Sequence, residues 1–373
     1  MIRVLGITLL ISGVKNVQTA YVSKNMMFKK FFYATLGGTI GAAFVGVSFA
    51  LAGFGAWALI AQSLFNNTVD TIILWITVKW RPKKKFSFER LKNLFSYSWK
   101  ILASALLDVG YNELRSLLIG KVYSSEDLAY YEKGRSWPRL IVNNVNASID
   151  SVLLPAMSSE QDDKTRIKEM TRKAIKTSTY VMAPLLMGLA FCGEPLIRFV
   201  LTEKWVPAAP FQLIFCITFM FYPIHTANLN AIKAIGRSDL FLKLEILKKS
   251  IGIALLVISF PFGVMAIAYS LLVSCLTSQI INTWPNRKLI GYGYFEQLRD
   301  ILPGMGLAVF MGAVVYWFKY LPINDVFILM LQVITGMIIY LGISYVLRLE
   351  SFTYTFGMIR KVLKIDKGRS GGR

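Results

Sequence analysis

Residues 97–121, YSWKILASALLDVGYNELRSLLIGK, decide the fold that this sequence predicts. The run is apolar and long enough to cross a membrane, yet it carries Asp108, Glu113 and Arg115. An ionisable group at bilayer depth costs from a few to roughly 10 kcal/mol or more, so such groups usually face a polar interior. At about 100° per residue, Asp108, Asn112 and Arg115 lie on one stripe. We therefore expect a membrane helix with one face turned to water, an ion or a charged cargo. The alternative is that Asp108 and Arg115 only neutralise partners on neighbouring helices.

Composition places the chain among multi-pass membrane proteins. Hydrophobic residues make up 55% of its 373 residues and charged residues only 17%, and apolar runs of near twenty residues recur along it. Each run has the length that spans a hydrocarbon core of about 30 Å. A net charge of +21 first suggests nucleic acid, but the basic residues lie in short segments between the apolar runs. We predict an all-α, polytopic bundle of transmembrane helices that contacts membrane lipids and binds no nucleic acid.

The apolar runs predict about eleven transmembrane helices. These lie at residues 2–21, 31–52, 56–78, 97–121, 137–157, 177–201, 210–233, 240–261, 263–283, 301–318 and 325–347. The first run resembles a cleaved leader because Arg3 precedes an apolar stretch, but Lys15 and Asn16 interrupt it and no small-x-small cleavage site follows. We therefore expect it to form a membrane helix with a polar face.

The distribution of Lys and Arg predicts which segments are cytoplasmic. If the loop at 22–30 lies inside and the spans alternate, the inner segments hold 32 basic residues and the outer segments hold 6. This bias is what the positive-inside rule expects. It predicts a cytoplasmic C-terminus and, with eleven spans, an external N-terminus.

Motifs for catalysis, metal binding and redox chemistry are missing from the sequence. The three cysteines are isolated within apolar runs, and His225 is the only histidine, so neither a metal-ligand cluster nor a disulfide framework is expected. A lone histidine in an apolar helix is more often a hydrogen-bonded interior group than a titrating one. The spans contain no GxxxxGK[ST] loop and no nucleophile elbow. We expect no enzymatic activity, no metal and no cofactor.

Seven segments of the sequence resemble segments of a known protein family, and they occur in the same order as in that family. They are LLISGVKNVQTAYVSKNMMFKKFF (9–32), GFGAWALIAQ (53–62), WRPKKKFSFERLKNLFSYSWK (80–100), IGKVYSSEDLAYYEKGRS (119–136), LLPAMSSEQDD (153–163), GEPLIRFVLTEKWVPAAP (193–210) and KAIGRSDLFLKLEILKK (233–249). Together they resemble the polysaccharide exporters that move undecaprenyl-linked O-antigen, colanic acid or teichuronic acid units. That family belongs to one superfamily with the lipid II flippases and the multidrug exporters. The resemblance covers nearly the whole chain.

The resemblance implies an organisation in lobes. Relatives usually have about fourteen helices in two six-helix lobes plus a C-terminal pair, and this chain resembles them from their fourth helix onward, so the first three are expected to be missing. The expected parts are a partial N-terminal lobe (1–78), a basic cytoplasmic linker (79–96), a six-helix C-terminal lobe (97–288), an extra helix pair (289–347) and a basic cytoplasmic tail (348–373). The linker also suits a surface segment attracted to anionic lipid.

The resemblance also implies a function. The chain is expected to translocate undecaprenyl-linked oligosaccharide units across the bacterial cytoplasmic membrane by ion-coupled alternating access. The product would be O-antigen, capsule, exopolysaccharide or teichuronic acid, and glycan polymerase or assembly proteins would be partners. Two alternatives stay open: a truncated, non-transporting component of a glycan assembly complex, and a drug or metabolite exporter of the same superfamily.

Three basic residues within the spans are candidates for binding the pyrophosphate of such a cargo: Lys15, Arg115 and Arg198. A guanidinium meets phosphate bidentately, whereas an ammonium acts as a point charge. For Arg198 the alternative is a simple ion pair with Glu194, four residues earlier.

Polar residues on one further helix are candidates for binding sugar and an ion. Within 137–157, Asn143, Asn146 and Asp150 share a stripe because they are spaced by three and four residues. We expect Asn143 and Asn146 to bind cargo. Asp108, together with Asp150, is the expected site of a coupling proton or sodium ion.

Overall fold

The computed structural model describes residues 2–24, 27–78, 80–81 and 87–357, and within these ranges it contains helices and no strand. Six helical segments of this part are long and apolar enough to cross a membrane: Phe32–Leu51, Lys164–Phe191, Glu203–Ala234, Val264–Leu289, Tyr294–Tyr320 and Asp325–Val346. The predicted all-α, multi-pass membrane class is confirmed. The other predicted spans also fall on helices. The chain divides into two compact units, Met1–Ser98 and Trp99–Arg373.

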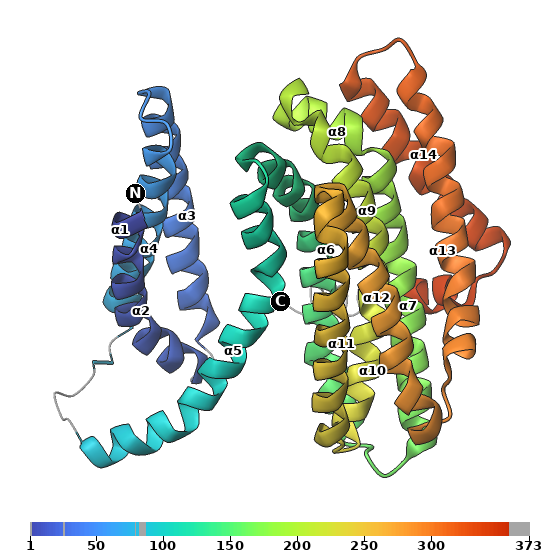
Figure 1. Cartoon of the computed structure of the whole chain (residues 1–373), viewed down its shortest axis with the longest axis horizontal. Coiled ribbons are helices and arrows are strands. Elements are labelled where there is room, and N and C mark those ends of the chain that lie inside the picture. The colour runs from blue at the N-terminus through green and yellow to red at the C-terminus, as the bar shows by residue number, and fades with distance from the viewer. Residues whose placement is uncertain (1, 25–26, 79, 82–86, 358–373) are drawn as a thin grey trace, which may run out of the picture. The chain divides into compact units, whose positions relative to one another are not determined.

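The first unit contains α1 (Ile2–Leu5), α2 (Ile7–Lys24), α3 (Phe28–Leu51) and α4 (Trp57–Thr77) (Figure 1). A tight turn joins α3 to α4, and Gly53 and Gly55 make it possible because their φ angles of 80° and 52° are left-handed. Glycine is also needed within α3, since a Cβ on Gly38 would lie 2.2 Å from Asp70 Oδ1 of α4. The two helices consequently pack closely along their length.

The second unit contains the part of α5 (Phe88–Val122) from residue 99 onward and the helices that follow it. These are α6 (Ser125–Ser158), α7 (Lys164–Phe191), α8 (Gly193–Leu201), α9 (Ala209–Phe219), α10 (Tyr222–Ala234), α11 (Ser238–Ser259), α12 (Val264–Leu289), α13 (Tyr294–Tyr316) and α14 (Asp325–Val346). Short 3₁₀ helices, η1 (Glu203–Ala208), η2 (Phe260–Phe262) and η3 (Trp317–Tyr320), join some of them.

Three of the predicted spans are interrupted in the structure, the first of them at Gly6, where the span expected at 2–21 is divided into α1 and α2. The span expected at 177–201 is divided into α7 and α8 at Cys192, and the span expected at 210–233 is divided into α9 and α10 just before Tyr222. Pro223 lies in the first turn of α10, where its missing N–H removes no helical hydrogen bond. Pro195 likewise lies in the first turn of α8, so the breaks before α8 and α10 each precede a helix that has a proline in its first turn.

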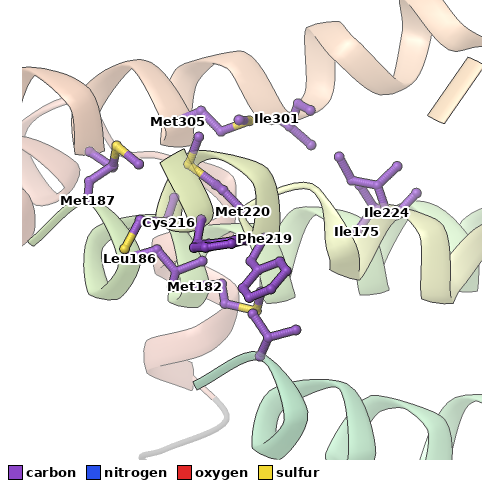
Figure 2. Packing of buried hydrophobic residues seen from close by; sticks show 14 of the residues in the cluster. Ile175, Met182, Leu186, Met187, Cys216, Phe219, Met220, Ile224, Ile301 and Met305 are labelled. Atoms are coloured by element: carbon purple, nitrogen blue, oxygen red, sulfur yellow. The ribbon is translucent and has the colours of Figure 1, made fainter. Parts of the chain in front are cut away.

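The apolar core of the second unit is built around α7 (Figure 2). Met182 and Leu186 of α7 are fully buried, and Phe219 and Met305 bring α9 and α13 against them. Flexible methionine side chains fill gaps of irregular shape in such a core. The core thus fixes α7, α9, α10 and α13 relative to one another.

A buried amide cluster ties α10, α12 and α13 together. Asn228 Nδ2 donates to Gln297 Oε1 at 2.8 Å, and Gln297 Nε2 donates back to Asn228 Oδ1 at 2.9 Å. Asn286 Nδ2 donates to the same Asn228 Oδ1 at 2.7 Å. All three side chains are buried, so these bonds are made away from competing water or lipid.

Candidate functional site

A cavity of about 410 Å³ lies within the second unit, between α5, α6, α10, α11 and α12. The described residues that line it include one acidic side chain, Glu245, and five basic ones: Arg115, Arg135, Arg139, Lys248 and Lys249. We call it the cationic cavity. Such an excess of positive charge within a membrane protein favours an anionic ligand.

Arg115 is the most deeply buried of these cations, with 3% of its surface exposed. Its Nη2 donates to the backbone oxygen of Gly252 at 3.4 Å, and its Nε finds no acceptor among the described residues. It forms no ion pair with any carboxylate in the part of the chain that the structure describes. A buried charge without a carboxylate partner costs several kcal/mol, so an anion in the cavity would supply this guanidinium with charge compensation that the described residues do not provide.

Arg135 and Arg139 are held in place by carboxylates at the edge of the cavity. Arg135 Nη2 lies 3.0 Å from a Glu113 oxygen and 3.3 Å from a Glu132 oxygen, and Arg139 Nη1 lies 3.3 Å from Glu113. The four-residue spacing puts both arginines and Asn143 on one face of α6. Each guanidinium has five N–H donors, so the ion pairs orient it without using up its capacity to donate.

The lysines reach the cavity from α11. Lys248 pairs with Glu245 one turn earlier, and Lys249 Nζ lies 5.7 Å from the centre of the Tyr111 ring. Gly252 allows α11 to approach α5 this closely, because a Cβ there would lie 2.0 Å from the Tyr111 hydroxyl. The lysine ammonium groups and Arg115 therefore approach the same cavity from two different helices.

His225 forms part of a hydrogen-bonded chain at the cavity wall. Asn282 Nδ2 lies 3.1 Å from His225 Nδ1, and His225 Nε2 lies 3.2 Å from the Cys275 sulfur. The Cys275 thiol in turn donates to the backbone oxygen of Thr218 at 3.3 Å. A neutral imidazole that carries its proton on Nε2 satisfies every partner, as expected of a hydrogen-bonded interior group.

Residues 1–210 match the family described as "Polysaccharide biosynthesis protein". The chain belongs to this family. The resemblance to polysaccharide exporters that the sequence predicts is thereby confirmed.

Several curated proteins are similar to this polysaccharide biosynthesis protein over part of their length. The teichuronic acid biosynthesis protein TuaB of Bacillus subtilis is 26% identical over 184 residues, which are 49% of this chain and 38% of TuaB. The succinoglycan biosynthesis transport protein ExoT of Rhizobium meliloti is 21% identical over 211 residues, 56% of this chain and 42% of ExoT. The probable low-salt glycan biosynthesis flippase Agl15 of Haloferax volcanii is 20% identical over 310 residues, 82% of this chain and 64% of Agl15. The chain thus spans less than two thirds of each of these relatives.

A solved structure has the same fold. The lipid II flippase MurJ in an inward closed conformation superposes with a TM-score of 0.73 at 15% identity, over 91% of this chain and 72% of MurJ. At this identity the likeness shows the fold alone.

Two of the predicted cargo-binding residues of this polysaccharide biosynthesis protein, Arg115 and Asn143, line the cationic cavity. Asn112, on the predicted stripe of α5, lines it as well. Asn146 is not among the lining residues, and its Oδ1 is buried without a partner in the described part of the chain. Asp150 accepts a hydrogen bond from Asn230 Nδ2 at 2.7 Å.

The remaining predicted site residues lie elsewhere. Lys15 belongs to the first unit, where its Nζ lies 3.2 Å from Asp70 Oδ2. Arg198 lies 2.6 Å from Glu203, 3.2 Å from Glu194 and 3.6 Å from Asp325, and these ion pairs agree with the alternative of a structural role. The side chain of Asp108 lies outside the described residues.

Four basic residues of the cavity were not expected from the sequence. Arg135 precedes the span expected at 137–157 and Arg139 lies at its start, so the charge count places both at the outer end of that helix, whereas α6 begins at Ser125 and both arginines lie within it. Lys248 and Lys249 fall within the span expected at 240–261 but were assigned to its cytoplasmic end, whereas in α11 both line the cavity. The start of α6 could have been predicted from the sequence, because Ser124 and Asp127 form a capping box that marks the first turn of the helix.

Proposed function

We propose that this protein translocates undecaprenyl-linked oligosaccharide units across the bacterial cytoplasmic membrane, and that the cationic cavity receives the diphosphate of this substrate. The similarity to a teichuronic acid biosynthesis protein, a succinoglycan transport protein and a probable glycan flippase supports this substrate class. The fold that it shares with a lipid II flippase supports a translocation mechanism rather than catalysis.

The observation that carries the proposal is the buried, incompletely hydrogen-bonded guanidinium of Arg115 in a cavity with four further basic side chains. A diphosphate diester carries two negative charges and several acceptor oxygens, which suit both the forked donors of arginine and the point charges of lysine. The cavity volume of about 410 Å³ lies within the range of sites that enclose a small-molecule group. Amide side chains such as Asn143 would donate to sugar hydroxyl groups.

Transport by this route would be driven by an ion gradient and would proceed by alternating access. A proton or sodium ion is the coupling ion that we propose, with Asp108 and Asp150 as candidate sites. Glycan polymerase and assembly proteins would consume the substrate on the far side.

Reconstitution of the purified chain tests the proposal. Proteoliposomes would contain a fluorescent undecaprenyl diphosphate-linked oligosaccharide, and a membrane-impermeant quencher would report how much of it reaches the outer leaflet. We expect faster equilibration between the leaflets than in protein-free vesicles. Tight binding without translocation would favour a non-transporting component of an assembly complex. If the protein neither binds nor translocates the lipid-linked oligosaccharide, the proposal is overturned.

A further inference from the structure

The side chain of Tyr131 lies in the wall of the cationic cavity and is held there by α9. Its ring packs edge-on against Phe215, with 5.1 Å between the ring centres, and against Phe211, with 6.0 Å. Gly134, three residues later on α6, allows the two helices to come this close, because a Cβ there would lie 2.6 Å from Phe211 Cβ and 2.8 Å from the Gln212 backbone nitrogen. Packing on α9 therefore fixes the Tyr131 ring, and with it the position of its hydroxyl group.

The Tyr131 hydroxyl has no hydrogen-bond partner within the described part of the chain. Four charged groups interact electrostatically with it: Arg115, Arg135, Glu113 and Glu132. The two arginines can only donate hydrogen bonds. Glu113 and Glu132 both pair with Arg135 instead. The proton of this buried hydroxyl consequently lacks an acceptor in the protein, an exception among buried polar groups that calls for an explanation.

Tyr131 and Arg115 each bring an unused donor to the same cavity. Both residues line it, Tyr131 with 0% and Arg115 with 3% of its surface exposed. The Nε of Arg115 also has no acceptor among the described residues. A phosphoryl group offers several charged acceptor oxygens, and hydrogen bonds to them are stronger than those between neutral groups. One bound phosphate could therefore satisfy a donor from α6 and a donor from α5 at once.

We propose that the Tyr131 hydroxyl donates a hydrogen bond to a phosphoryl oxygen of the substrate in the cationic cavity. This inference rests on the proposed function and adds a neutral donor to a site described so far by its basic side chains. A basic side chain attracts any anion, whereas a hydroxyl donor adds no positive charge and acts only along the direction of its bond. Tyr131 thus distinguishes a correctly placed phosphoryl oxygen from an anion that is drawn in by charge alone.

Tyr131→Phe tests this role in the full chain, because it removes the hydroxyl and keeps the ring. Binding of inorganic pyrophosphate and of undecaprenyl diphosphate to the protein in detergent would be measured by calorimetric titration. We expect both affinities to fall by about 10- to 100-fold, the effect of losing one hydrogen bond to a charged group. The removed hydroxyl has no partner in the described part of the chain, so the unfolding midpoint of the ligand-free protein should not fall.

Tyr340→Phe is the matched control. Tyr340 of α14 is also buried, but its hydroxyl donates to the Tyr180 backbone oxygen at 2.8 Å, and it is not among the described residues that line the cavity. This variant should bind both ligands like the wild type and should unfold at a lower temperature, because a buried backbone oxygen loses its donor.

The two measurements separate this inference from the proposed function. Unchanged pyrophosphate affinity in Tyr131→Phe would overturn the inference, even if the affinity for a lipid-linked oligosaccharide fell, since the hydroxyl would then bind a sugar. A lower midpoint of ligand-free Tyr131→Phe would also overturn it, because the hydroxyl would then have a partner within the protein. A wild-type protein that binds pyrophosphate through Tyr131 but translocates no lipid would overturn the proposed function alone. Binding of neither ligand by the wild type would overturn both.

Discussion

The guanidinium carbon of Arg115 lies 5.8 Å from the centre of the Tyr111 ring, one turn earlier on α5. Lys249 approaches the same ring to 5.7 Å from α11. Two cations from different helices therefore share one aromatic neighbour in the wall of the cationic cavity. A ring face attracts each cation by only about 0.5–2 kcal/mol, so the aromatic contact does not replace an anion.

Arg115→Ala should weaken binding of undecaprenyl diphosphate by about 10- to 100-fold, since a hydrogen bond to a charged group contributes about 1.5–3 kcal/mol. Arg115→Lys should retain part of the affinity because the charge survives while the forked geometry does not. Equilibrium binding to the purified variants measures both. Arg198→Ala is the matched control, because Arg198 is already paired with three carboxylates away from the cavity. Unchanged affinity in a folded Arg115→Ala protein would contradict the role assigned to this residue.

The predicted orientation can be tested with single cysteines. Ser125 is exposed at the start of α6, on the side that the positive-inside rule places outside, and Ser159 is exposed in the segment after α6, which it places inside. A membrane-impermeant maleimide should label Ser125→Cys in intact cells and Ser159→Cys only after the cells are opened. The three native cysteines are buried and should give little background. The reverse labelling pattern would invert the proposed topology.

The membrane class and one wall of the cavity could be predicted from the sequence. Apolar runs of spanning length indicate membrane helices whatever the tertiary structure. Helical periodicity also put Asn112 and Arg115 on one stripe, and both line the cavity. Features that depend on one helix alone are readable in this way.

Features that depend on how helices pair were not readable. Lys248 and Lys249 reach the cavity only because α11 approaches α5 at Gly252, and no pattern within either helix encodes that contact. Lys15 and Asp70 are 55 residues apart, and their pairing requires α2 to pack on α4. Periodicity gives the face on which a residue lies but not the helix that meets this face.

Gln297→Met should destabilise the second unit. The substitution removes both bonds between Gln297 and Asn228 and leaves the buried Asn228 amide partly unpaired, which costs about 1–3 kcal/mol. A lower midpoint of thermal unfolding is the expected result. Gln161→Met, at an exposed position after α6, should leave the midpoint unchanged. Equal midpoints for the two variants would show that the amide cluster does not stabilise the fold.

The contact between Gly252 and Tyr111 can be tested by a double-mutant cycle. Gly252→Ala keeps the backbone oxygen that accepts from Arg115, but its Cβ would lie 2.0 Å from the Tyr111 hydroxyl and 3.1 Å from the ring carbon that bears it. Tyr111 must therefore shift, and we expect weaker binding of undecaprenyl diphosphate and a lower unfolding midpoint. Tyr111→Phe removes the oxygen that clashes, so the double variant Tyr111→Phe/Gly252→Ala should recover most of both losses. In that background alanine should even stabilise α11, by up to about 1 kcal/mol relative to glycine, because it is the better helix former. The coupling free energy from the four proteins measures the contact directly. Additive effects of the two substitutions would mean that Tyr111 does not lie against Gly252.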